Sequence, residues 1–290
     1  QRLSRGLGDV YKRQDETIKF LEKFSKSKEN FFLAFGLYRP HIPFVAPKKY
    51  FELYEKDYMD VPSNGDDFLK TISAPAAKSL RARKEQINLD DSTIKTVKEA
   101  YYATTSFVDA QVGKVLDKLK ETGLDKNTIV VFTSDHGYHL GEKGHWQKQT
   151  LYDRATRVPL IISGPGIISG LKIKDSPVEL VDLYKTLMDM ANVSTPEFVQ
   201  GFSLKDVLTK NIQPKRKSAL SEVNVYLEGK KAQGYSIKTD RFRLIKWNHK
   251  DQNYYELYDH KFEKEENINL VNNTKSVSYT HLALPTTTIV

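Results

Sequence analysis

The stretch Ile129-Val130-Val131-Phe132-Thr133-Ser134-Asp135-His136-Gly137 decides how this chain is expected to fold. Its first four residues are apolar and mostly β-branched, which predicts a buried strand. An Asp, a His and a Gly follow where that strand ends, and in open α/β sheets ligands bind beyond the carboxyl ends of the strands. Asp135 and His136 offer one carboxylate oxygen and one imidazole nitrogen, so the sequence predicts half of a cation site here.

Helical and strand patterns alternate on both sides of this stretch. From Asp91 onward, apolar residues recur at spacings of three and four, which predicts a long helix that Gly123 ends. The other elements expected in this part are strands at 31–37 and 158–163 and a helix at 178–191. Strand, helix and strand in succession are typical of parallel crossover units. The chain is therefore predicted to have an α/β fold, with a mostly parallel central sheet flanked by helices.

The pattern changes after about residue 212. Short β-like runs follow one another there without intervening helices, at 219–226, 234–238, 242–247 and 254–258. Such runs predict hairpin-connected antiparallel strands. We expect residues 15–212 to form the larger α/β part of the chain and residues 213–276 to form a small C-terminal antiparallel α+β subdomain.

The two ends of the chain do not share the periodicity of their neighbours. Residues 1–14 and 277–290 resemble translated sequencing-adapter read-through, and both are predicted to be non-native tails. The first native element is then expected to be a short helix capped by Asp15.

Composition limits the classes of protein that remain. The 290 residues are 39% hydrophobic, and the formal net charge of +8 suits an anionic partner. The absence of cysteine excludes disulfides and unmodified thiol nucleophiles. No apolar window reaches the roughly 18 residues of a membrane span, and no secretory signal is visible. A nucleic-acid role is disfavoured, because no helix is basic and aromatic and basic residues are not regularly interleaved.

Two further clusters carry chemistry beyond Asp135 and His136. His41 lies in Arg39-Pro40-His41-Ile42-Pro43-Phe44, and Lys148 ends Lys143-Gly144-His145-Trp146-Gln147-Lys148. Together these side chains would suit a tetrahedral oxyanion, with the cation and the lysine stabilising charge and an imidazole protonating a leaving oxygen. Each also has a structural interpretation. The Asp-His pair could be a capped turn, His41 a loop filler and Lys148 a solvated lysine, and His139, His145 and Arg157 are expected to be structural.

The spacing of these motifs resembles that of the sulfatase family in the alkaline-phosphatase-like superfamily, in particular its iduronate-2-sulfatase-like branch. The resemblance spans about residues 15–272, and it implies that residues 15–212 are the C-terminal part of a catalytic domain. It is carried by the apolar run 31–37, by Arg39 to Tyr50, by Phe132 to Gly137, by Leu140-Gly141-Glu142, by Lys148, by Ala155 to Ile161 and by Tyr255 to Asp259.

The resemblance implies a function and a role for each candidate residue. Asp135 and His136 match two ligands of a single active-site calcium, His41 matches a histidine that contacts the sulfate ester and assists the leaving alcohol, and Lys148 matches a lysine that binds the sulfate. The family's nucleophile is a hydrated formylglycine made from the Cys or Ser of a C/S-x-P-x-R motif, which attacks sulfur and releases the alcohol. The implied substrate is a sulfated carbohydrate of the glycosaminoglycan type, with 2-O-sulfated uronate as a candidate.

The chain departs from the family pattern at the nucleophile. It has no cysteine, and the nearest serine motif, Ser73-Ala74-Pro75-Ala76-Ala77, lacks the Arg and follows His41 instead of preceding it. The early Asp-Asp pair that completes the calcium site is also missing. We therefore expect an N-terminally truncated fragment that is inactive alone, from a protein expected to be periplasmic or secreted. No prediction is made of its oligomeric state.

Two other functions remain open at this stage. The first is a phosphodiesterase or phosphonate-ester hydrolase of the same superfamily, for which His139 and His145 offer spare ligands. The second is a non-catalytic polyanion- or glycan-binding protein, which the positive charge and the 11% aromatic content permit.

Overall fold

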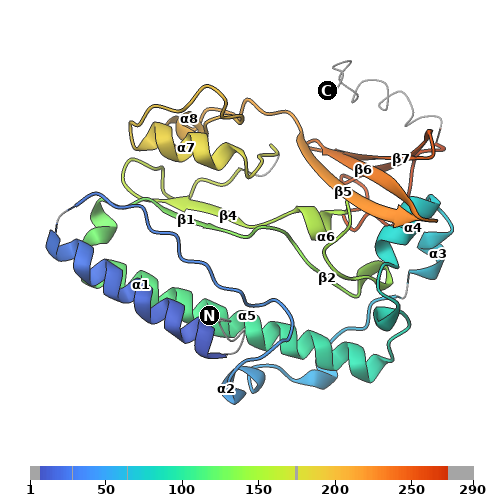
Figure 1. The fold of residues 1–290 in the computed structure, drawn as a ribbon, viewed down its shortest axis with the longest axis horizontal. Coiled ribbons are helices and arrows are strands. Elements are labelled where there is room, and N and C mark those ends of the chain that lie inside the picture. Colours follow the sequence, from blue (N-terminus) through green and yellow to red (C-terminus); the bar gives the residue numbers. More distant parts are fainter. Residues whose placement is uncertain (1–6, 28, 64, 174–175, 274–290) are drawn as a thin grey trace. The chain divides into compact units, whose positions relative to one another are not determined.

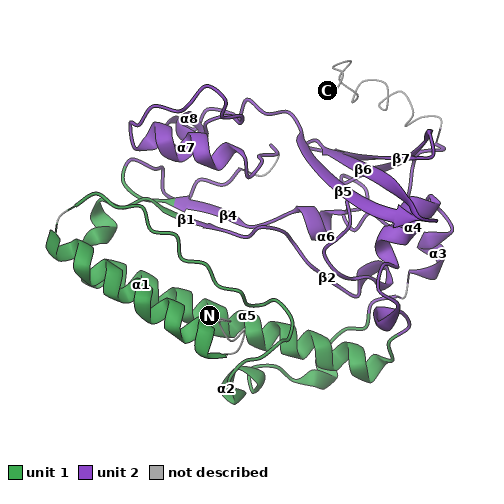
Figure 2. Ribbon diagram, viewed as in Figure 1, with its two compact units in different colours: residues 1–61, 89–130, 163–165 green, residues 62–88, 131–162, 166–290 purple. Residues whose placement is uncertain are grey.

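Figure 1 shows the computed structural model of the chain, which describes residues 7–27, 29–63, 65–173 and 176–273. The chain divides into two compact units, which Figure 2 colours separately. Unit 1 is built from residues 1–61, 89–130 and 163–165, and unit 2 from residues 62–88, 131–162 and 166–290. The boundary predicted between residues 212 and 213 falls inside unit 2.

Unit 1 is helical. Its elements are α1 (Leu7–Ser27), α2 (Lys48–Phe51), η1 (Lys56–Tyr58), α5 (Asp91–Glu121) and η3 (Leu124–Lys126). The carboxylate of Asp90 accepts the Thr93 N–H at 3.0 Å and so caps α5, while Gly123 follows the helix with φ of +72°. Val10 of α1 and Phe107 of α5 are buried in one cluster, which joins the two helices. The predicted long helix ended by Gly123 is confirmed.

The first helix begins earlier than predicted. The expectation that Asp15 caps it is wrong, because α1 starts at Leu7 and Asp15 is an exposed residue within it. Val10, Gln14, Thr17 and Leu21 are buried along one face, so the helical periodicity runs through residues 7–14. Whether residues 1–14 are native stays a prediction. Residues 1–6 and the predicted tail 277–290 lie outside the described residues.

The predicted strand at 31–37 is not a strand in the structure. Its side chains alternate between half-buried and exposed, as in an extended chain, and Phe32 is 84% exposed. A β-strand needs a hydrogen-bonded neighbour, and within the described ranges no strand pairs with this segment. The prediction of a central strand at residues 31–37 is therefore wrong.

Unit 2 holds most of the strands. Strands β1 (Val130–Thr133) and β4 (Leu160–Ser163) form a two-stranded sheet, close to the ranges predicted. The short strands β2 (His139–Leu140) and β3 (Trp146–Gln147) pair antiparallel. The helices of this unit are α3 (Asp66–Leu69), α4 (Ala74–Leu80), η2 (Lys84–Gln86), η4 (Glu142–Gly144), α6 (Asp153–Thr156), α7 (Asp182–Met190) and α8 (Lys205–Lys210). None of the helices in the described ranges is both long and apolar enough to cross a membrane.

The predicted C-terminal antiparallel sheet is confirmed. Its strands are β5 (Ala219–Leu227), β6 (Lys230–Lys238), β7 (Phe242–His249) and β8 (Gln252–Asp259), in the order β5-β6-β7-β8 (Figure 1). One face packs Ile245, Trp247 and Tyr258 against Tyr152 and Phe68, which forms the main core of unit 2. Gly234 of β6 lies opposite Trp247 of β7, and a Cβ on Gly234 would lie 2.7 Å from the indole ring. Glycine at this position therefore allows the ring to lie against the sheet.

Candidate functional site

The turn after β1 places Asp135 and His136 side by side. His136 Nδ1 lies 2.8 Å from the Gly137 carbonyl oxygen, which fixes Nδ1 as the protonated nitrogen and leaves the lone pair on Nε2. Asp135 Oδ1 accepts the His136 backbone N–H at 3.1 Å, and Oδ2 lies 3.4 Å from His136 Nε2. The Asp135 side chain is 82% exposed. One carboxylate oxygen and one imidazole nitrogen thus lie together in an open position.

This pair of donors fits half of a metal site. Two ligands of one Ca²⁺, each at about 2.3–2.6 Å, commonly lie close to 3.4 Å apart, and the Nδ1–H bond to a carbonyl is the usual support of a ligating histidine. Among the described residues, no third Asp, Glu, His or Cys joins the pair in a group that could hold an ion. The turn therefore offers two donor atoms side by side, and a complete metal site would need others.

The backbone of the turn is fixed by α6. The Gly137 N–H donates to the Ala155 carbonyl oxygen at 2.8 Å. A Cβ on Gly137 would lie 2.1 Å from the Arg154 carbonyl oxygen and 2.8 Å from that of Arg157, far inside contact distance. Gly137 is therefore required by the close approach of two backbones.

Replacing Gly137 with alanine is expected to force the turn away from α6 and to destabilise the protein by about 1–3 kcal/mol, the usual cost of overpacking. Urea unfolding measures this loss. Nitrogen chemical shifts of His136 report whether its Nδ1–H bond survives. Gly36 is the matched control, because a Cβ there meets nothing within 4 Å and Gly36→Ala should change stability little. Equal stability of the two variants would contradict the packing described.

Lys148 lies in the bend that follows β3 and is half-buried. Its carbonyl oxygen accepts the Thr150 N–H at 2.7 Å, and the Thr150 hydroxyl is 2.9 Å from His139 Nε2. His139 is fully buried, so it anchors this bend from the interior. The structure therefore gives His139 a supporting role and shows no described contact between Lys148 and Asp135 or His136.

His139 and His145 form a buried pair whose ring centroids are 4.9 Å apart. Burial lowers the pKa of His139 well below its usual value, and burial lowers the pKa of His145 to about 4. The His145 Nδ1–H donates to the Leu80 carbonyl oxygen at 2.9 Å. Both rings are therefore neutral near pH 7, which agrees with the structural interpretation of these two residues.

His41 lies in unit 1, whereas Asp135, His136 and Lys148 lie in unit 2. The prolines on both sides of it follow cis peptide bonds, Arg39-Pro40 and Ile42-Pro43. His41 Nδ1 lies 2.8 Å from the Ile42 carbonyl oxygen, and its ring centroid is 4.6 Å from that of Tyr38. With Nδ1 engaged in this way, Nε2 is the ring nitrogen suited to exchange a proton with a ligand.

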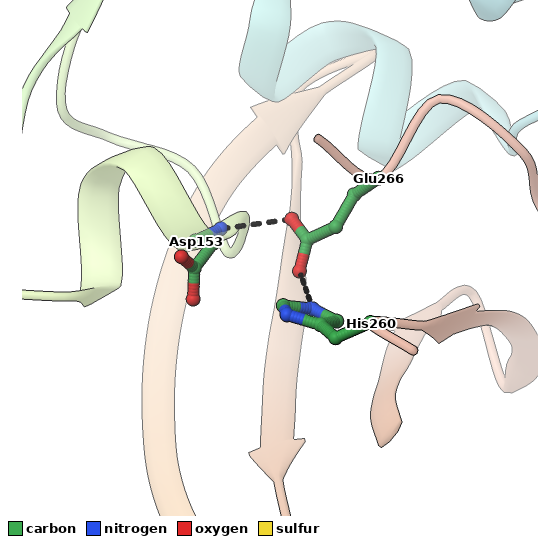
Figure 3. A group of neighbouring side chains, drawn as sticks. All are labelled: Asp153, His260 and Glu266. Atoms are coloured by element: carbon green, nitrogen blue, oxygen red, sulfur yellow. Dashed lines mark hydrogen bonds and ion pairs between the residues drawn. The ribbon is translucent and has the colours of Figure 1, made fainter. Parts of the chain in front are cut away.

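Sequence reasoning missed a buried ion-pair network behind α6. The Glu266 carboxylate accepts one hydrogen bond from His260 Nε2 and one from the Asp153 backbone N–H, each at 2.8 Å (Figure 3). Arg243 donates to Glu266 at 2.5 Å, to Asp153 at 2.8 Å and to Ser236 at 2.7 Å. Burial alone would raise the pKa of Glu266, but the charge of Arg243 and the bond from His260 hold it at about 2. A lone arginine in the β-like run 242–247 is the signal that could have indicated this network.

Asp153, His260 and Glu266 present their oxygen and nitrogen atoms as a metal site would. The Arg243 guanidinium already supplies the positive charge, however, since it bonds to both carboxylates. The cluster is therefore an ion-pair network. Because Asp153 begins α6 and Ala155 of α6 holds Gly137, this network supports the turn that carries Asp135 and His136.

Comparisons with known proteins identify the family to which the chain is similar. The sulfatase family model matches residues 10–193, and the model of the N-sulphoglucosamine sulphohydrolase C-terminal region matches residues 141–283. A sulfatase of Formosa agariphila is 36% identical over 261 residues, which are 88% of this chain and 49% of that protein. Iduronate 2-sulfatase of Mus musculus is 33% identical over 217 residues, 63% of this chain and 39% of that enzyme. The chain thus spans about half or less of the length of these curated relatives.

Solved structures show the same fold. A phosphonate monoester hydrolase from Silicibacter pomeroyi superposes with a TM-score of 0.82 and 27% identity, covering 94% of this chain and 58% of that one. A structure solved in complex with its substrate, D-glucosamine-2-N,6-O-disulfate, gives a TM-score of 0.75 and 25% identity, covering 94% and 67%. With the family model matched over more than half of its residues, the chain belongs to the sulfatase family of the alkaline-phosphatase-like superfamily.

Proposed function

We propose that the gene product to which this chain belongs hydrolyses sulfate esters of carbohydrate, with a glycosaminoglycan-type substrate such as a 2-O-sulfated uronate. The observation that carries the proposal is the Asp135–His136 turn, where Oδ2 and Nε2 lie 3.4 Å apart and a carbonyl holds the histidine tautomer. Membership of the sulfatase family supports sulfate esters as the substrate class. The same family leads us to expect a periplasmic or secreted protein.

The metal in this proposal is a single Ca²⁺, of which this chain provides two ligands, Asp135 and His136. Bound calcium would supply positive charge to the oxygens of the sulfate group. The carboxylate suits a hard cation, and the exposed position of Asp135 allows further oxygen ligands from polypeptide outside these 290 residues.

Lys148 and His41 take the remaining roles in this proposal. The Lys148 ammonium binds the sulfate and offsets charge that develops as the ester bond breaks. His41 donates a proton from Nε2 to the leaving alcohol oxygen. The nucleophile is a formylglycine contributed from outside this chain, so the 290-residue polypeptide by itself is expected to be inactive.

Hydrolysis of a phosphonate monoester is the second candidate. The observation that favours it is the superposition on the phosphonate monoester hydrolase from Silicibacter pomeroyi, with a TM-score of 0.82. Sulfate and phosphonate esters are both tetrahedral oxyanions, so the described residues suit either substrate. The two candidates are distinguished by measuring which ester is hydrolysed faster.

The test extends the reading frame of the source DNA upstream of the codon for Asp15 and expresses the longer product. We expect it to hydrolyse 4-methylumbelliferyl sulfate, to lose that activity when calcium is chelated and to regain it when calcium returns. Asp135→Asn or His136→Gln should lower turnover by at least about 100-fold, because each removes a metal ligand.

Asp125→Asn is the matched control, since Asp125 is an exposed carboxylate on η3 and should leave turnover unchanged. Faster cleavage of 4-methylumbelliferyl phenylphosphonate, a phosphonate monoester with the same leaving alcohol, than of the sulfate would establish the second candidate. Sulfate hydrolysis by the 290-residue chain itself would disprove the external nucleophile.

A further inference from the structure

The outer face of the β5–β8 sheet carries two ordered rows of polar and aromatic side chains. Register in the antiparallel sheet places the members of each row directly opposite one another across the four strands. The first row is Glu222, Tyr235, Lys246 and Tyr255, and the second is Asn224, Gln233, Asn248 and Asn253. We call these eight residues, together with Tyr226 and Lys231 beside the second row, the outer platform.

The outer platform lies opposite the core of unit 2. Side chains alternate between the two faces of a strand, and the intervening Ile245 and Trp247 are buried on the inner face. On the outer face Tyr226 is 70% exposed and Tyr255 is 37% exposed. Tyr235, on a central strand, is half-buried by its neighbours. The tyrosine rings thus contribute accessible aromatic surface to a sheet that the core has already stabilised from the other side.

The amide groups of the outer platform are held in place by Glu222 and by one another. Glu222 Oε1 accepts from Asn224 at 3.2 Å and from Gln233 at 3.0 Å. Asn248 donates to Asn253 at 3.2 Å. Each amide keeps donors or acceptors to spare, because an amide side chain offers two N–H groups and two lone pairs. A surface with this many amides suits a ligand rich in hydroxyl groups better than an apolar helix.

The charge of the outer platform is suited to an anion. Lys246 lies near its centre and Lys231 at its margin, and within the described part of the chain neither makes an ion pair. Glu222 is the single carboxylate of the platform, and its oxygen is engaged by the two amides. The chain as a whole has a formal net charge of +8, which adds a long-range attraction for polyanions.

We propose that the outer platform binds a sulfated polysaccharide. Tyr235 and Tyr255 would pack on the apolar faces of sugar rings, since tyrosine combines a large apolar surface with a polar end. The amides of the second row would bind hydroxyl groups, and Lys246 would bind a sulfate. None of the proposed catalytic or metal-binding residues belongs to the platform, so this site goes beyond the proposed activity and would hold polymer at a second place on unit 2.

The test is titration calorimetry of the complete 290-residue chain with a size-defined heparin octasaccharide, with its desulfated form and with inorganic sulfate. We expect binding of the octasaccharide, at least tenfold weaker binding of the desulfated form, and no measurable binding of sulfate alone. Tyr235→Ala, Tyr255→Ala and Lys246→Ala should each weaken octasaccharide binding at least about fivefold, because buried aromatic and charged anchors dominate such contacts.

The matched controls are Tyr58→Ala and Lys126→Ala, which alter an 83% exposed tyrosine and an exposed lysine of unit 1. Equal weakening by platform and control variants would show diffuse electrostatic attraction and overturn the proposal. So would a dimer, detected by light scattering, that Tyr235→Ala dissociates, since the occupant would then be a second copy. Asp135→Asn should leave octasaccharide affinity unchanged, which separates a failure of this proposal from a failure of the proposed activity.

Discussion

Replacing Arg243 with alanine is expected to lower the free energy of unfolding by about 3–5 kcal/mol, the cost of removing one partner from a buried ion pair. The Arg243 side chain is 2% exposed and bonds to Glu266, Asp153 and Ser236, which come from three other segments of unit 2. Without the guanidinium, the Glu266 carboxylate would remain buried beside a second carboxylate with insufficient positive charge nearby. Urea unfolding followed by tryptophan fluorescence suits this measurement, because Trp247 lies in the adjacent core.

Two further variants make the result specific. Arg83→Ala is the matched control, because Arg83 pairs with Glu85 at 3.9 Å with both side chains more than half exposed, and such pairs contribute under about 1 kcal/mol. The double variant Arg243→Met with Glu266→Gln removes both charges and should recover part of the stability lost in Arg243→Ala. A loss of less than about 1 kcal/mol in Arg243→Ala would show that the network does not hold unit 2 together.

Replacing Glu256 with glutamine is expected to remove a destabilising charge above neutral pH. Glu256 is fully buried, and burial raises its pKa to about 7 although Tyr258 and Tyr152 both donate hydrogen bonds to it. Because the folded-state pKa lies above the ordinary 4.5, the folded protein holds its proton where the unfolded chain has lost it. The protonated Glu256 side chain therefore contributes stability that is complete below pH 4.5 and is lost as the pH rises through about 7.

The expected size of this pH-dependent stability difference follows from the pKa shift of Glu256. A change in pKa from 4.5 to about 7 corresponds to about 3 kcal/mol, so the stability of Glu256→Gln relative to the parent should rise by about that much between pH 4.5 and pH 8. The difference between the two proteins has to be measured at each pH. His145, whose pKa burial lowers to about 4, stabilises the fold above pH 6.5 and loses that contribution as the pH falls, which is the opposite trend.

Glu197→Gln serves as the control, because Glu197 is exposed in the same unit and should give a flat difference over this range. A flat difference for Glu256→Gln as well would mean that Glu256 ionises normally and that its surroundings are more polar than the structure shows.

Local sequence determined the elements whose signals are contained within them. The spacing of apolar residues from Asp91 to Gly123 specifies α5, because one face of a helix returns every three to four residues. Alternation and turn residues specify the four antiparallel strands, whose neighbours in the sheet are also neighbours along the chain. The Asp135–His136 pair could be predicted for the same reason, because the strand, the two donor residues and the glycine follow one another directly in the sequence.

Tertiary structure decided everything that depends on a distant partner. The run 31–37 has the composition of a strand, but pairing is a property of two segments, and no described strand pairs with it. Arg243 contacts Asp153, 90 residues away in sequence, and Tyr152 bonds to Glu256, 104 residues away, so neither the ion-pair network nor the raised pKa of Glu256 has a local signature. The requirement for glycine at 137 likewise comes from the carbonyls of Arg154, in α6, and Arg157, just after it, which reach Gly137 only in the folded chain. Hydrophobic periodicity acts within one element, whereas burial, charge compensation and steric exclusion exist only once separate elements have packed.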